Sequence, residues 1–540
     1  MKDISSTGSF IDFTLENFIY VDKTEYIPKL VKLKRVFISR PRRFGKSLTL
    51  DTIATLFETG VEPYFKGTWI YDKWTEPTYP VLRLNFLDLD KYSLEHFKQK
   101  LNAIISSFAR DINVKNYEEK VEPEDTIYFL LDELRKEKRQ IVILIDEYDC
   151  QMTANINNET LYKQFQEKIK SFYATIKNKW PIKFLGITGV TRLKDVEIFS
   201  IGSDINDITN ESAFSQLIGF TRDEIKKYYI DYLKLAASYE NKCRVEEVTD
   251  AQIESMLDMM AQNYDGYCFD EDYEKKVFNT WSVNKFFQTM VGKKKVQFGE
   301  YWYDNGGLPS ILVNYLKTHE LNIFEYLDKD KFLKVSSDDF KNPTALTTIN
   351  QNVLMCQTGY LTLRSDLNKT STVALGIPNG EIYKALNRLL ANNIFKGNTD
   401  ITDDYGRSLL EVGTVDDIIN LFNSALNSVS YDNYPIVSES SVQNMLKLYL
   451  LGAHQKVLSE VHEAKGRADL VVNTDNRRIV FEFKYAKNET EAKTKLSEAV
   501  EQIKTRDYGN ILPKKAELIR IAAVFNADPK VRAFTEFQLV

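Results

Sequence analysis

The chain is poor in the residues that hold zinc or build disulfide frameworks. Its 540 residues include four histidines and four cysteines, and the cysteines lie far apart without a Cys-x-x-Cys pair: Cys150, Cys243, Cys268 and Cys356. We therefore expect no zinc site. Long apolar runs are also absent, because no stretch approaches the ~20 residues that a membrane span requires. The first residues lack the apolar segment of a signal peptide. These absences predict a soluble protein of a reducing compartment, the cytoplasm, with no membrane partner.

An excess of positive charge is absent as well. The net charge is −6, which argues against a protein that binds nucleic acid over its whole surface but leaves room for a local basic groove. The basic runs at 32–35 and 293–295 are more typical of solvated faces than of a track for phosphates. Repeats and low-complexity tracts are not seen. With 43% hydrophobic and 12% aromatic residues, the chain can form about three or four folded domains.

The most informative pattern is a hairpin near the C-terminal end. Residues 466–473 and 478–484 are rich in Val, Ile and Phe and read as strands on either side of a tight turn. If that turn has a two-residue loop, Asp469 faces Glu482 directly on the same face of the sheet. Lys484, two residues beyond Glu482, joins that face. Two carboxylates and one ammonium therefore converge on one patch.

This patch has the chemistry of a phosphodiesterase site. Two adjacent carboxylates repel each other unless a cation lies between them, and oxygen ligands suit Mg²⁺ or Mn²⁺. The lysine can neutralise a phosphate or help to position a hydroxide. The pattern thus indicates metal-dependent phosphodiester hydrolysis. The alternative is a surface hairpin in which Glu482 and Lys484 form an ordinary salt bridge.

Two flanking helices complete the pattern. Glu439 lies in the first turn of an apolar-periodic helix, and Gln502 lies on an amphipathic helix after the hairpin. The order helix, hairpin, helix with Glu, Asp, Glu-x-Lys and Gln resembles the PD-(D/E)XK nuclease superfamily, although the proline of that name is absent before Asp469. The resemblance implies that Glu439, Asp469 and Glu482 hold the metal. It also implies that Lys484 assists the attacking water and that Gln502 supports the site.

A phosphate-binding loop is predicted near the other end of the chain. Residues 36–39 form a short apolar strand, and residues 40–47 read Arg-Pro-Arg-Arg-Phe-Gly-Lys-Ser, with a helix from about Leu48. In this layout the backbone around Gly45 and the helix N-terminus hold phosphates. Lys46 reaches the β and γ oxygens, and Ser47 ligates Mg²⁺. The first glycine of G-x-x-x-x-G-K-S is an arginine here, which leaves open whether the loop hydrolyses ATP or only binds it.

Two further apolar strands support this prediction. Residues 139–147 form a nearly continuous apolar run that ends in two acids, as expected for a buried parallel strand with ligands at its C-terminal end. Asp146 would complete the Mg²⁺ shell and Glu147 would polarise the attacking water. A third apolar strand is read at 182–192. Thr188 at its end could sense the γ-phosphate, and Arg192 could either reach that phosphate or form a surface salt bridge.

These pieces resemble the AAA-ATPase-like family, whose members begin with a Tyr-Val-Asp-Lys-Thr segment and carry the same Arg-Pro-Arg-Arg-Phe-Gly-Lys-Ser loop. The segment lies at 20–24 here, and Arg40 at the first loop position is a trait of the family. Further matches lie at 217–221, 264–267, 306–309 and 357–361. The family is typically fused to a PD-(D/E)XK domain, so the resemblance covers essentially the whole chain.

The expected fold is α/β and multidomain. It combines a P-loop NTPase parallel sheet with helices on both faces, a helical lid, a winged-helix-like middle and a C-terminal α/β restriction-endonuclease-like domain. The expected domains are an AAA-like core at 1–220, a lid at 221–316, a winged-helix-like region at 317–400, a linker with a connecting helix at 401–434 and a nuclease domain at 435–540.

Three features of the middle region refine this picture. The Gly-Gly-Leu-Pro motif at 306–309 resembles the lid motif of STAND ATPases, with a plain interhelical turn as the alternative. Strands at 359–363 and 372–378 suggest a wing, and without a basic helix we favour an internal transducer over a DNA-binding module. The stretch at 398–408 is the most linker-like.

The leading hypothesis is an ATP-controlled, metal-dependent nuclease with ATP and Mg²⁺ or Mn²⁺ as cofactors and DNA as the expected partner. By analogy only, it would serve prokaryotic defence or mobile-element biology. One alternative is a nucleotide-dependent signalling switch whose nuclease-like domain binds rather than cuts, and another is an RNA-directed nuclease. Homo-oligomerisation, a protein trigger and sequence preference stay open.

Overall fold

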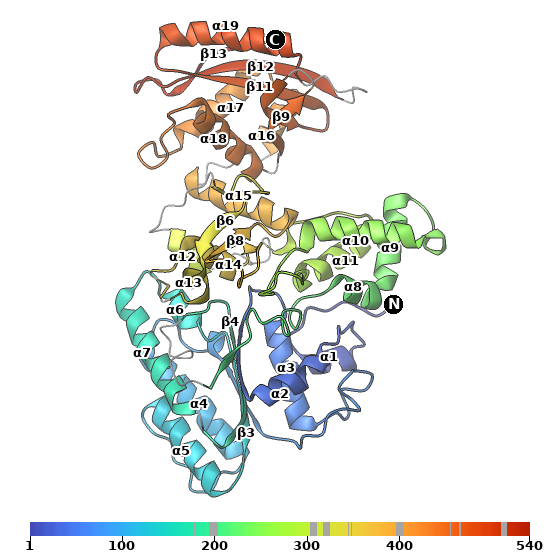
Figure 1. Cartoon of the computed structure of the whole chain (residues 1–540), viewed down its shortest axis with the longest axis vertical. Coiled ribbons are helices and arrows are strands. Elements are labelled where there is room, and N and C mark those ends of the chain that lie inside the picture. The colour runs from blue at the N-terminus through green and yellow to red at the C-terminus, as the bar shows by residue number, and fades with distance from the viewer. Residues whose placement is uncertain are drawn as a thin grey trace. The chain divides into compact units, whose positions relative to one another are not determined.

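The computed structural model describes the chain apart from residues 178, 194–203, 303–309, 317–324, 344, 347, 396–403, 454, 464, 465 and 509–515. The chain forms two compact units (Figure 1). The first comprises Met1–His319 and Phe332–Ile382, and the second comprises Glu320–Lys331 and Tyr383–Val540.

A parallel sheet forms the centre of the first unit. Its strand order is β2-β3-β4-β1-β5, with β1 (Arg35–Ser39), β2 (Val81–Asn85), β3 (Ile141–Asp146), β4 (Ile182–Gly189) and β5 (Asn206–Asp207). All neighbouring strands run parallel. Strands β1 and β3 are buried along their whole length, as expected where helices cover both faces. The predicted P-loop NTPase sheet is therefore confirmed.

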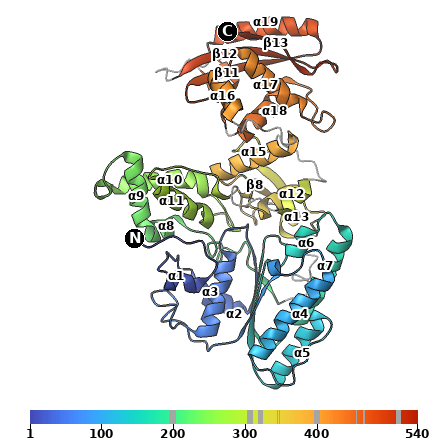
Figure 2. The ribbon, with the colours of Figure 1, turned by 180° about the vertical axis from the view of Figure 1, so that it is seen from behind.

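Helices flank this sheet on both sides (Figures 1 and 2). One side carries α1 (Phe10–Leu15), α2 (Ile27–Leu33) and α3 (Lys46–Thr59), and the other carries α4 (Leu94–Asp111), α5 (Pro123–Lys136) and α7 (Glu159–Ile176). Short helices η1 (Thr24–Tyr26), η2 (Phe86–Asp88) and α6 (Cys150–Ala154) lie between them. Helix α3 begins at Lys46 rather than at about Leu48, because Gly45 with φ of 102° turns the loop directly into the helix.

The region predicted as a helical lid is mostly helical where it is described, with a non-helical stretch at 265–279. It contains α8 (Arg222–Tyr228), α9 (Ile230–Asn241), η4 (Val245–Glu247), α10 (Asp250–Tyr264), α11 (Thr280–Lys293) and α12 (Ser310–Leu316). Ile19 and Val21 of the N-terminal segment share a hydrophobic core with α8 to α11. The Gly-Gly-Leu-Pro motif at 306–309 lies outside the described residues.

A small antiparallel sheet follows in the order β6-β8-β7. It consists of β6 (Leu333–Ser336), β7 (Thr362–Leu363) and β8 (Thr372–Gly376), with α13 (Ser337–Lys341) and α14 (Gln351–Gln357) beside it. The two predicted wing strands are present but shorter, and β6 adds a third. The four residues of β6 are too short a run for the sequence pattern to distinguish.

The second unit is built on a mixed sheet in the order β13-β12-β11-β10-β9. Its strands are β9 (Lys456–Glu463), β10 (Gly466–Asn473), β11 (Arg477–Ala486), β12 (Glu517–Asn526) and β13 (Ala533–Leu539). Strands β11 and β12 pair parallel, and the other pairs are antiparallel. Helix α19 (Glu489–Arg506) covers one face, and α16 (Asp404–Val412), α17 (Val415–Asn427) and α18 (Glu439–Gly452) lie on the other (Figures 1 and 2).

The linker prediction for 398–408 needs a correction. Residues 404–408 begin helix α16, and the earlier part of the stretch lies outside the described residues. Leu410 in this helix is completely buried, so tertiary packing outweighs the loop-like composition around Gly406.

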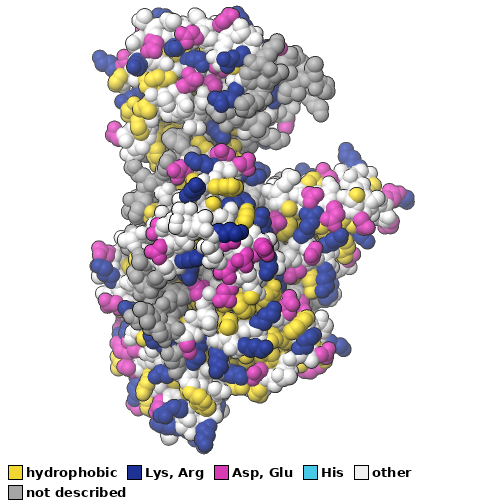
Figure 3. Space-filling view, viewed as in Figure 1, with side chains coloured by type: hydrophobic (Ala, Val, Ile, Leu, Met, Phe, Trp, Pro, Cys, Tyr) yellow, Lys and Arg dark blue, Asp and Glu magenta, His cyan; other side chains and the backbone are white. Residues whose placement is uncertain are grey.

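The surface agrees with the modest net charge. On the face of the first unit seen in Figure 3, basic and acidic side chains are interspersed rather than gathered into one large basic patch. Among the described residues, no helix is both long enough and apolar enough to span a bilayer.

Candidate functional site

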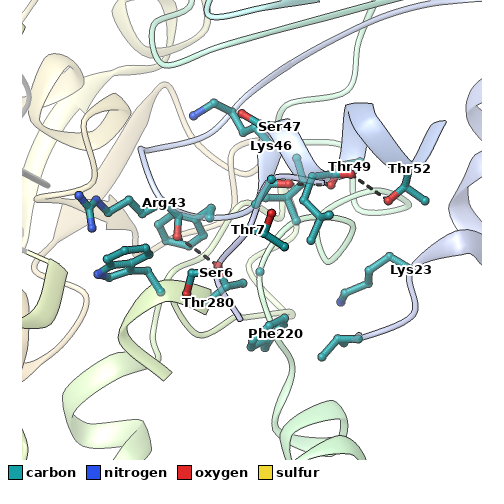
Figure 4. A pocket seen from close by; sticks show the side chains of 18 of the residues that line it. Ser6, Thr7, Lys23, Arg43, Lys46, Ser47, Thr49, Thr52, Phe220 and Thr280 are labelled. Carbon is teal, nitrogen blue, oxygen red and sulfur yellow. Dashed lines mark hydrogen bonds between the residues drawn. The ribbon is translucent and has the colours of Figure 1, made fainter. Parts of the chain in front are cut away.

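A cavity of about 500 Å³ lies over the Gly-Lys-Ser loop of the first unit. It is lined by residues 42–49, by 5–8 and parts of 19–24 from the N-terminal segment, by 217–220, and by Thr280 and Trp281 of α11. Figure 4 shows Lys46, Ser47, Lys23 and Thr280 around this space, contributed by different elements. The segments at 20–24, 40–47 and 217–221 that carry the family resemblance thus meet at one cavity of a size suited to a small ligand.

The N-terminal segment is fixed to the helical lid. Three side chains of α9 and α11 donate to its backbone carbonyls: Tyr232 Oη to Lys2 O (2.9 Å), Gln288 Nε2 to Ile4 O (2.9 Å) and Asn284 Nδ2 to Ser5 O (3.1 Å). The residues that follow, 5–8, line the cavity. The lid therefore holds one wall of the cavity through backbone hydrogen bonds.

The lysine of the loop is engaged by the protein itself. Lys46 Nζ donates to the carbonyl oxygens of Arg40 (3.1 Å) and Pro41 (3.2 Å) and lies 3.6 Å from Glu147 Oε1. Glu147 has φ of 52°, and burial raises its pKa while the neighbouring ammonium lowers it. A raised pKa suits a residue that accepts a proton from water. The structure thus brings Lys46 and Glu147 together at the cavity.

The predicted magnesium ligands are also adjacent. The Ser47 hydroxyl donates to Asp146 Oδ2 at 2.5 Å, and the Thr188 hydroxyl donates to Asp146 Oδ1. Asp146 and Thr188 are buried at the ends of β3 and β4. Both carboxylate oxygens therefore have protein partners, and Thr188 touches the predicted metal ligand rather than lining the cavity.

Arg192 is placed away from the cavity. Its guanidinium forms an ion pair with Asp207 of β5, and its backbone N–H donates to Gln357 Oε1 (3.3 Å). Of the two interpretations that the sequence left open, the structure shows the salt bridge. A role as phosphate sensor stays a prediction.

Arg40, at the first loop position, points into the protein. It is 1% exposed, its Nη1 donates to Ser39 O (2.9 Å) and Thr209 O (2.6 Å), and its guanidinium lies 4.1 Å from the ring centroid of Phe269. Burial lowers its pKa to about 9. This arginine therefore fixes the loop to the segment after β5, and it is not among the residues that line the cavity.

In the second unit, the hairpin has the predicted register. Leu470 pairs with Phe481 and Asn473 with Arg478, and Thr474 N donates to Arg477 O at 2.9 Å. Continuing this register by one residue places Asp469 opposite Glu482. Val471 and Val480 of the same two strands pack against Ala499 and Ile503 of α19.

The two carboxylates lie in a desolvated environment. Glu482 is 0% exposed, and its Oε2 is buried without a hydrogen-bond partner. Burial and the charge of Asp469 raise the pKa of Glu482 to about 7. Burial likewise raises the pKa of Asp469 to about 6, although its Oδ2 accepts a hydrogen bond from Phe483 N (2.8 Å). Each carboxylate therefore gains from a nearby cation.

Lys484 supplies one such cation. Its Nζ lies 2.9 Å from Glu482 Oε1 and 3.5 Å from Glu439 Oε1, so that α18 and β11 meet at this ammonium. Gln502, which was predicted to support the site, lies on α19. Its amide donates to Tyr508 Oη (3.3 Å), which also accepts from Arg506 Nη1 (2.8 Å), and no hydrogen bond to the carboxylates is seen in the described part of the site.

Comparison with known families agrees with both halves of this picture. Residues 5–199 match a family described as a predicted AAA-ATPase, and residues 437–535 match the PD-(D/E)XK nuclease superfamily. The chain joins an AAA-ATPase-like domain to a PD-(D/E)XK nuclease-superfamily domain. Domains of these kinds have enzyme activity, use ATP and divalent metal ions respectively, and in the second case act on nucleic acid.

The chain is also similar to individual proteins. An uncharacterized protein in the vnfD 5′ region of Azotobacter chroococcum mcd 1 is 25% identical over 532 residues, which cover 95% of this chain and 94% of that protein. The Cdc6p structure from Pyrobaculum aerophilum has 11% identity, covers 68% of this chain and 93% of that one, and gives a TM-score of 0.22. The Aeropyrum pernix Orc1 protein in complex with DNA has 10% identity, 69% and 95% coverage, and a TM-score of 0.27.

The carboxylates of the nuclease-superfamily domain fit a divalent cation. The unpartnered Glu482 Oε2 is a buried anionic ligand, and the raised pKa values of Glu482 and Asp469 reflect charge that a cation would stabilise. Within the described residues, no three Asp, Glu, His or Cys side chains gather closely enough to hold an ion by themselves. Lys484 instead stands beside Glu439 and Glu482. Glu482 and Asp469 would hold the ion, with Glu439 behind the lysine.

Sequence reasoning missed two groups of the nuclease-superfamily site. The side chain of Gln443 forms a hydrogen bond that lowers the pKa of Asp469, as does the backbone N–H of Phe483. Gln443 lies four residues after Glu439 on α18, so both side chains project from the same face of the helix. The spacing of four residues between Glu439 and Gln443 is the sequence signal that could have identified Gln443.

Proposed function

We propose that the protein is an ATP-controlled nuclease in which the AAA-ATPase-like domain regulates metal-dependent cleavage of DNA by the PD-(D/E)XK domain. The observation that carries this proposal is the buried pair Asp469 and Glu482, with an unpartnered carboxylate oxygen and a lysine within hydrogen-bonding distance. A surface salt bridge would not require a fully buried glutamate.

In the nuclease site, we assign each side chain a separate role. Asp469 and Glu482 would hold Mg²⁺ or Mn²⁺, and Glu439, the third predicted ligand, would stand beside them at Lys484. When bound, the ion would lower the pKa of water and stabilise charge on the phosphate. Lys484 positions the attacking water, and Gln443 and Phe483 N–H orient Asp469. Gln502 supports the site through Tyr508.

In the nucleotide site, Gly45 and the α3 N-terminus receive the phosphates and Lys46 pairs with them. Ser47 and Asp146 hold the magnesium ion, Thr188 orients Asp146, and Glu147 polarises water. The lid of residues 221–316 and the winged-helix-like region of 317–400 would act as STAND-like transducers to the domain of 435–540. A role in prokaryotic defence or mobile-element biology is part of the proposal by analogy.

The test is cleavage by the purified full chain with Mg²⁺ or Mn²⁺, with and without ATP, on single- and double-stranded DNA and RNA. We expect DNA to be cut, and Glu482→Ala to reduce cutting by at least about 10³-fold while ATP turnover stays within twofold. Nicking that persists in Glu482→Ala would remove the site assignment.

Two other results would redirect the function. Cleavage of RNA alone would replace the DNA substrate. ATP turnover without cleavage under any combination would favour the second candidate, a nucleotide-dependent switch. The placement of Lys484 between Glu439 and Glu482, where it neutralises them without a metal, is the observation that favours that candidate.

A further inference from the structure

Helix α15 (Gly380–Ile394) belongs to both units, because the boundary between them falls after Ile382. Its first turn lies in the unit with the phosphate-binding loop, and its other turns lie in the unit with the hairpin. A helix of its 15 residues is about 22 Å long and is held together by consecutive hydrogen bonds. It is therefore a continuous hydrogen-bonded segment of chain that begins in one unit and ends in the other.

The first turn of α15 is tied to the phosphate-binding loop by Glu381. This carboxylate is 2% exposed and accepts hydrogen bonds from the Ser282 hydroxyl of α11 (2.7 Å) and from Trp302 N (2.8 Å). The indole N–H of Trp302 in turn donates to the carbonyl oxygen of Arg42 inside the loop (3.2 Å). One buried carboxylate thus joins the lid helix, the loop and the start of α15.

The motif at 264–267, which the chemistry of neither site explains, contacts the same turn. Asn379 Nδ2 donates to Asp265 O (2.7 Å), and Asn379 Oδ1 accepts from Ile382 N (3.0 Å). Gly266 has φ of 93°, and a Cβ there would lie 2.3 Å from the carbonyl oxygen of Pro378. The motif therefore packs closely against residues 378 and 379, which directly precede α15.

The motif at 357–361 contacts the loop from another side. A Cβ on Gly359 would lie 2.8 Å from Pro41 Cβ, so only glycine fits against the loop there. Gln357 Nε2 donates to Arg192 O (3.4 Å) and Gln357 Oε1 accepts from Arg192 N (3.3 Å), which joins this motif to the end of β4. The motif at 357–361 thus packs against the phosphate-binding loop, whereas the motif at 264–267 packs against the start of α15.

The far end of α15 packs on the helix that carries Glu439. A Cβ on Gly452 of α18 would lie 2.3 Å from Ala391 Cβ, and the ring of Phe395, just after α15, lies 5.1 Å from that of Tyr449. The first residue of α18 is Glu439, whose carboxylate lies 3.5 Å from the ammonium of the hairpin lysine. Helix α18 therefore connects α15 to the nuclease site.

We propose that α15 and α18 carry the nucleotide state from the phosphate-binding loop to the nuclease site. Glu381 is the positioning residue at the start of this route, and the contact of Gly452 with Ala391 is its central joint. Phosphates that bind the backbone N–H groups of the loop reorient its peptide units, and the Arg42 carbonyl belongs to one of them. The inference rests on the proposed function and assigns its regulation to named contacts.

The first test measures hydrogen exchange of the full chain with Mg²⁺ alone and with Mg²⁺ and ATP. We expect ATP to change exchange in α3, α15 and α18 by at least about fivefold. Trp302→Phe removes the donor to Arg42, so we expect the response of α3 to persist and that of α15 and α18 to be lost. ATP that protects α3 while α15 and α18 stay unchanged in the wild-type chain would overturn the proposal. This readout needs no cleavage, so its failure is distinguishable from failure of the proposed function.

The second test uses Gly452→Ala, which forces α18 away from α15 without touching either site. We expect the ratio of cutting with ATP to cutting without ATP to move at least about fivefold towards one, while ATP turnover stays within twofold. Gly292→Ala on α11 is the matched control, because nothing lies within 4 Å of its added Cβ. A wild-type ratio in a folded Gly452→Ala chain contradicts the proposal.

A third variant covers the case in which Gly452→Ala unfolds the second unit, seen as a loss of protection throughout it. Glu381→Gln keeps the shape and one acceptor oxygen of the side chain but removes its charge, and Lys384→Gln at an exposed position of α15 is the control. We expect the ATP response of α15 to fall several-fold in Glu381→Gln alone. An unchanged response there would also refute the route.

Discussion

The two sites of this chain contain the same kinds of residue, a lysine beside acidic side chains. The hydrogen-bonding groups of these residues have different partners at the two sites. At the phosphate-binding loop, both oxygens of Asp146 accept hydroxyl hydrogen bonds and Lys46 donates to two backbone carbonyls. At the hairpin, Glu482 has one buried oxygen with no partner, and its pKa is raised to about 7. The polar groups of the first site have protein partners, whereas the second site keeps a buried carboxylate oxygen without a hydrogen-bond partner.

This difference indicates different responses to ligands. Nucleotide must displace Lys46 from Arg40 O and Pro41 O before its phosphates can pair with the lysine, so binding exchanges one set of hydrogen bonds for another. A divalent ion at the hairpin would bind Glu482 Oε2 without displacing a hydrogen-bond partner, because this oxygen has none. We therefore expect the loop to respond by rearranging and the hairpin to respond by losing protons.

After the loss of cutting expected for Glu482→Ala, the largest effect should come from Lys46→Ala, which removes the cation that pairs with nucleotide phosphates. We expect ATP turnover to fall by about 10²–10³-fold, as the loss of a charge aimed at the transition state predicts. Binding of Mn²⁺ to the second unit should not change, because Asp469 and Glu482 are untouched. Turnover assays and Mn²⁺ titration by calorimetry measure the two properties. ATP turnover at the wild-type rate in Lys46→Ala would show that this lysine does not pair with nucleotide phosphates.

The second prediction concerns pH, because metal binding requires both carboxylates to lose their protons. With pKa values of about 6 for Asp469 and about 7 for Glu482, cutting at subsaturating Mn²⁺ should rise about 100-fold from pH 5.5 to pH 8. ATP turnover in the same buffers is the internal control. A flat cleavage profile would show that these groups are not metal ligands.

Stability without metal should depend on pH in the opposite sense. Both groups have folded-state pKa values above their ordinary values, so they stabilise the fold fully below about pH 4 and lose that contribution as pH rises through 6 to 7. We expect the metal-free melting transition of the second unit to fall by roughly 8–15 °C between pH 5 and pH 8, because the two groups together lose about 4 kcal/mol over this range. The Asp469→Asn, Glu482→Gln double variant should lose this slope.

A smaller effect is expected from Arg40→Gly, which restores the consensus glycine of the loop. The change removes charged hydrogen bonds to Ser39 O and Thr209 O and the contact with Phe269, so we expect stability to fall by about 2–4 kcal/mol. Denaturant unfolding of the first unit measures this, with Arg42→Gly as the comparison at a less buried loop position. A stabilised Arg40→Gly chain would show that the arginine serves ligand binding instead.

The smallest effect should come from Gln443→Ala. Its hydrogen bond lowers the pKa of Asp469, so its removal should raise that pKa and move the cleavage profile to higher pH by a few tenths of a unit. The maximal rate at high pH should change by less than about threefold. A reduced maximum with no shift in the profile would instead place Gln443 on the substrate.

Local rules were sufficient for the hairpin, because a two-residue turn fixes the register of the strands that it joins. The position of Asp469 opposite Glu482 therefore followed from counting residues. The parallel strands β1, β3 and β4 were equally clear from their continuous apolar runs. In each case the structure depends on residues close together in the sequence.

Other features depend on contacts that no local pattern contains. Arg40 donates to the carbonyl oxygen of Thr209, which lies 169 residues further along the chain, so no local pattern could predict this contact. Helix α16 forms where Asp404 and Gly406 suggest a linker, because Leu410 is buried in the fold. The raised pKa values of the hairpin carboxylates depend on their burial in the folded second unit, which no local pattern contains.

The attachment of residues 2–5 to α9 and α11 has a practical consequence for biochemistry. These residues lead directly into the wall of the nucleotide cavity, and their carbonyls are held by Tyr232, Asn284 and Gln288. An affinity tag placed ahead of them would be attached next to residues 5–8, which line the cavity, and would disturb their positions. ATP affinities should therefore be measured on untagged protein, and protease resistance of this segment offers a simple gauge of whether nucleotide is bound.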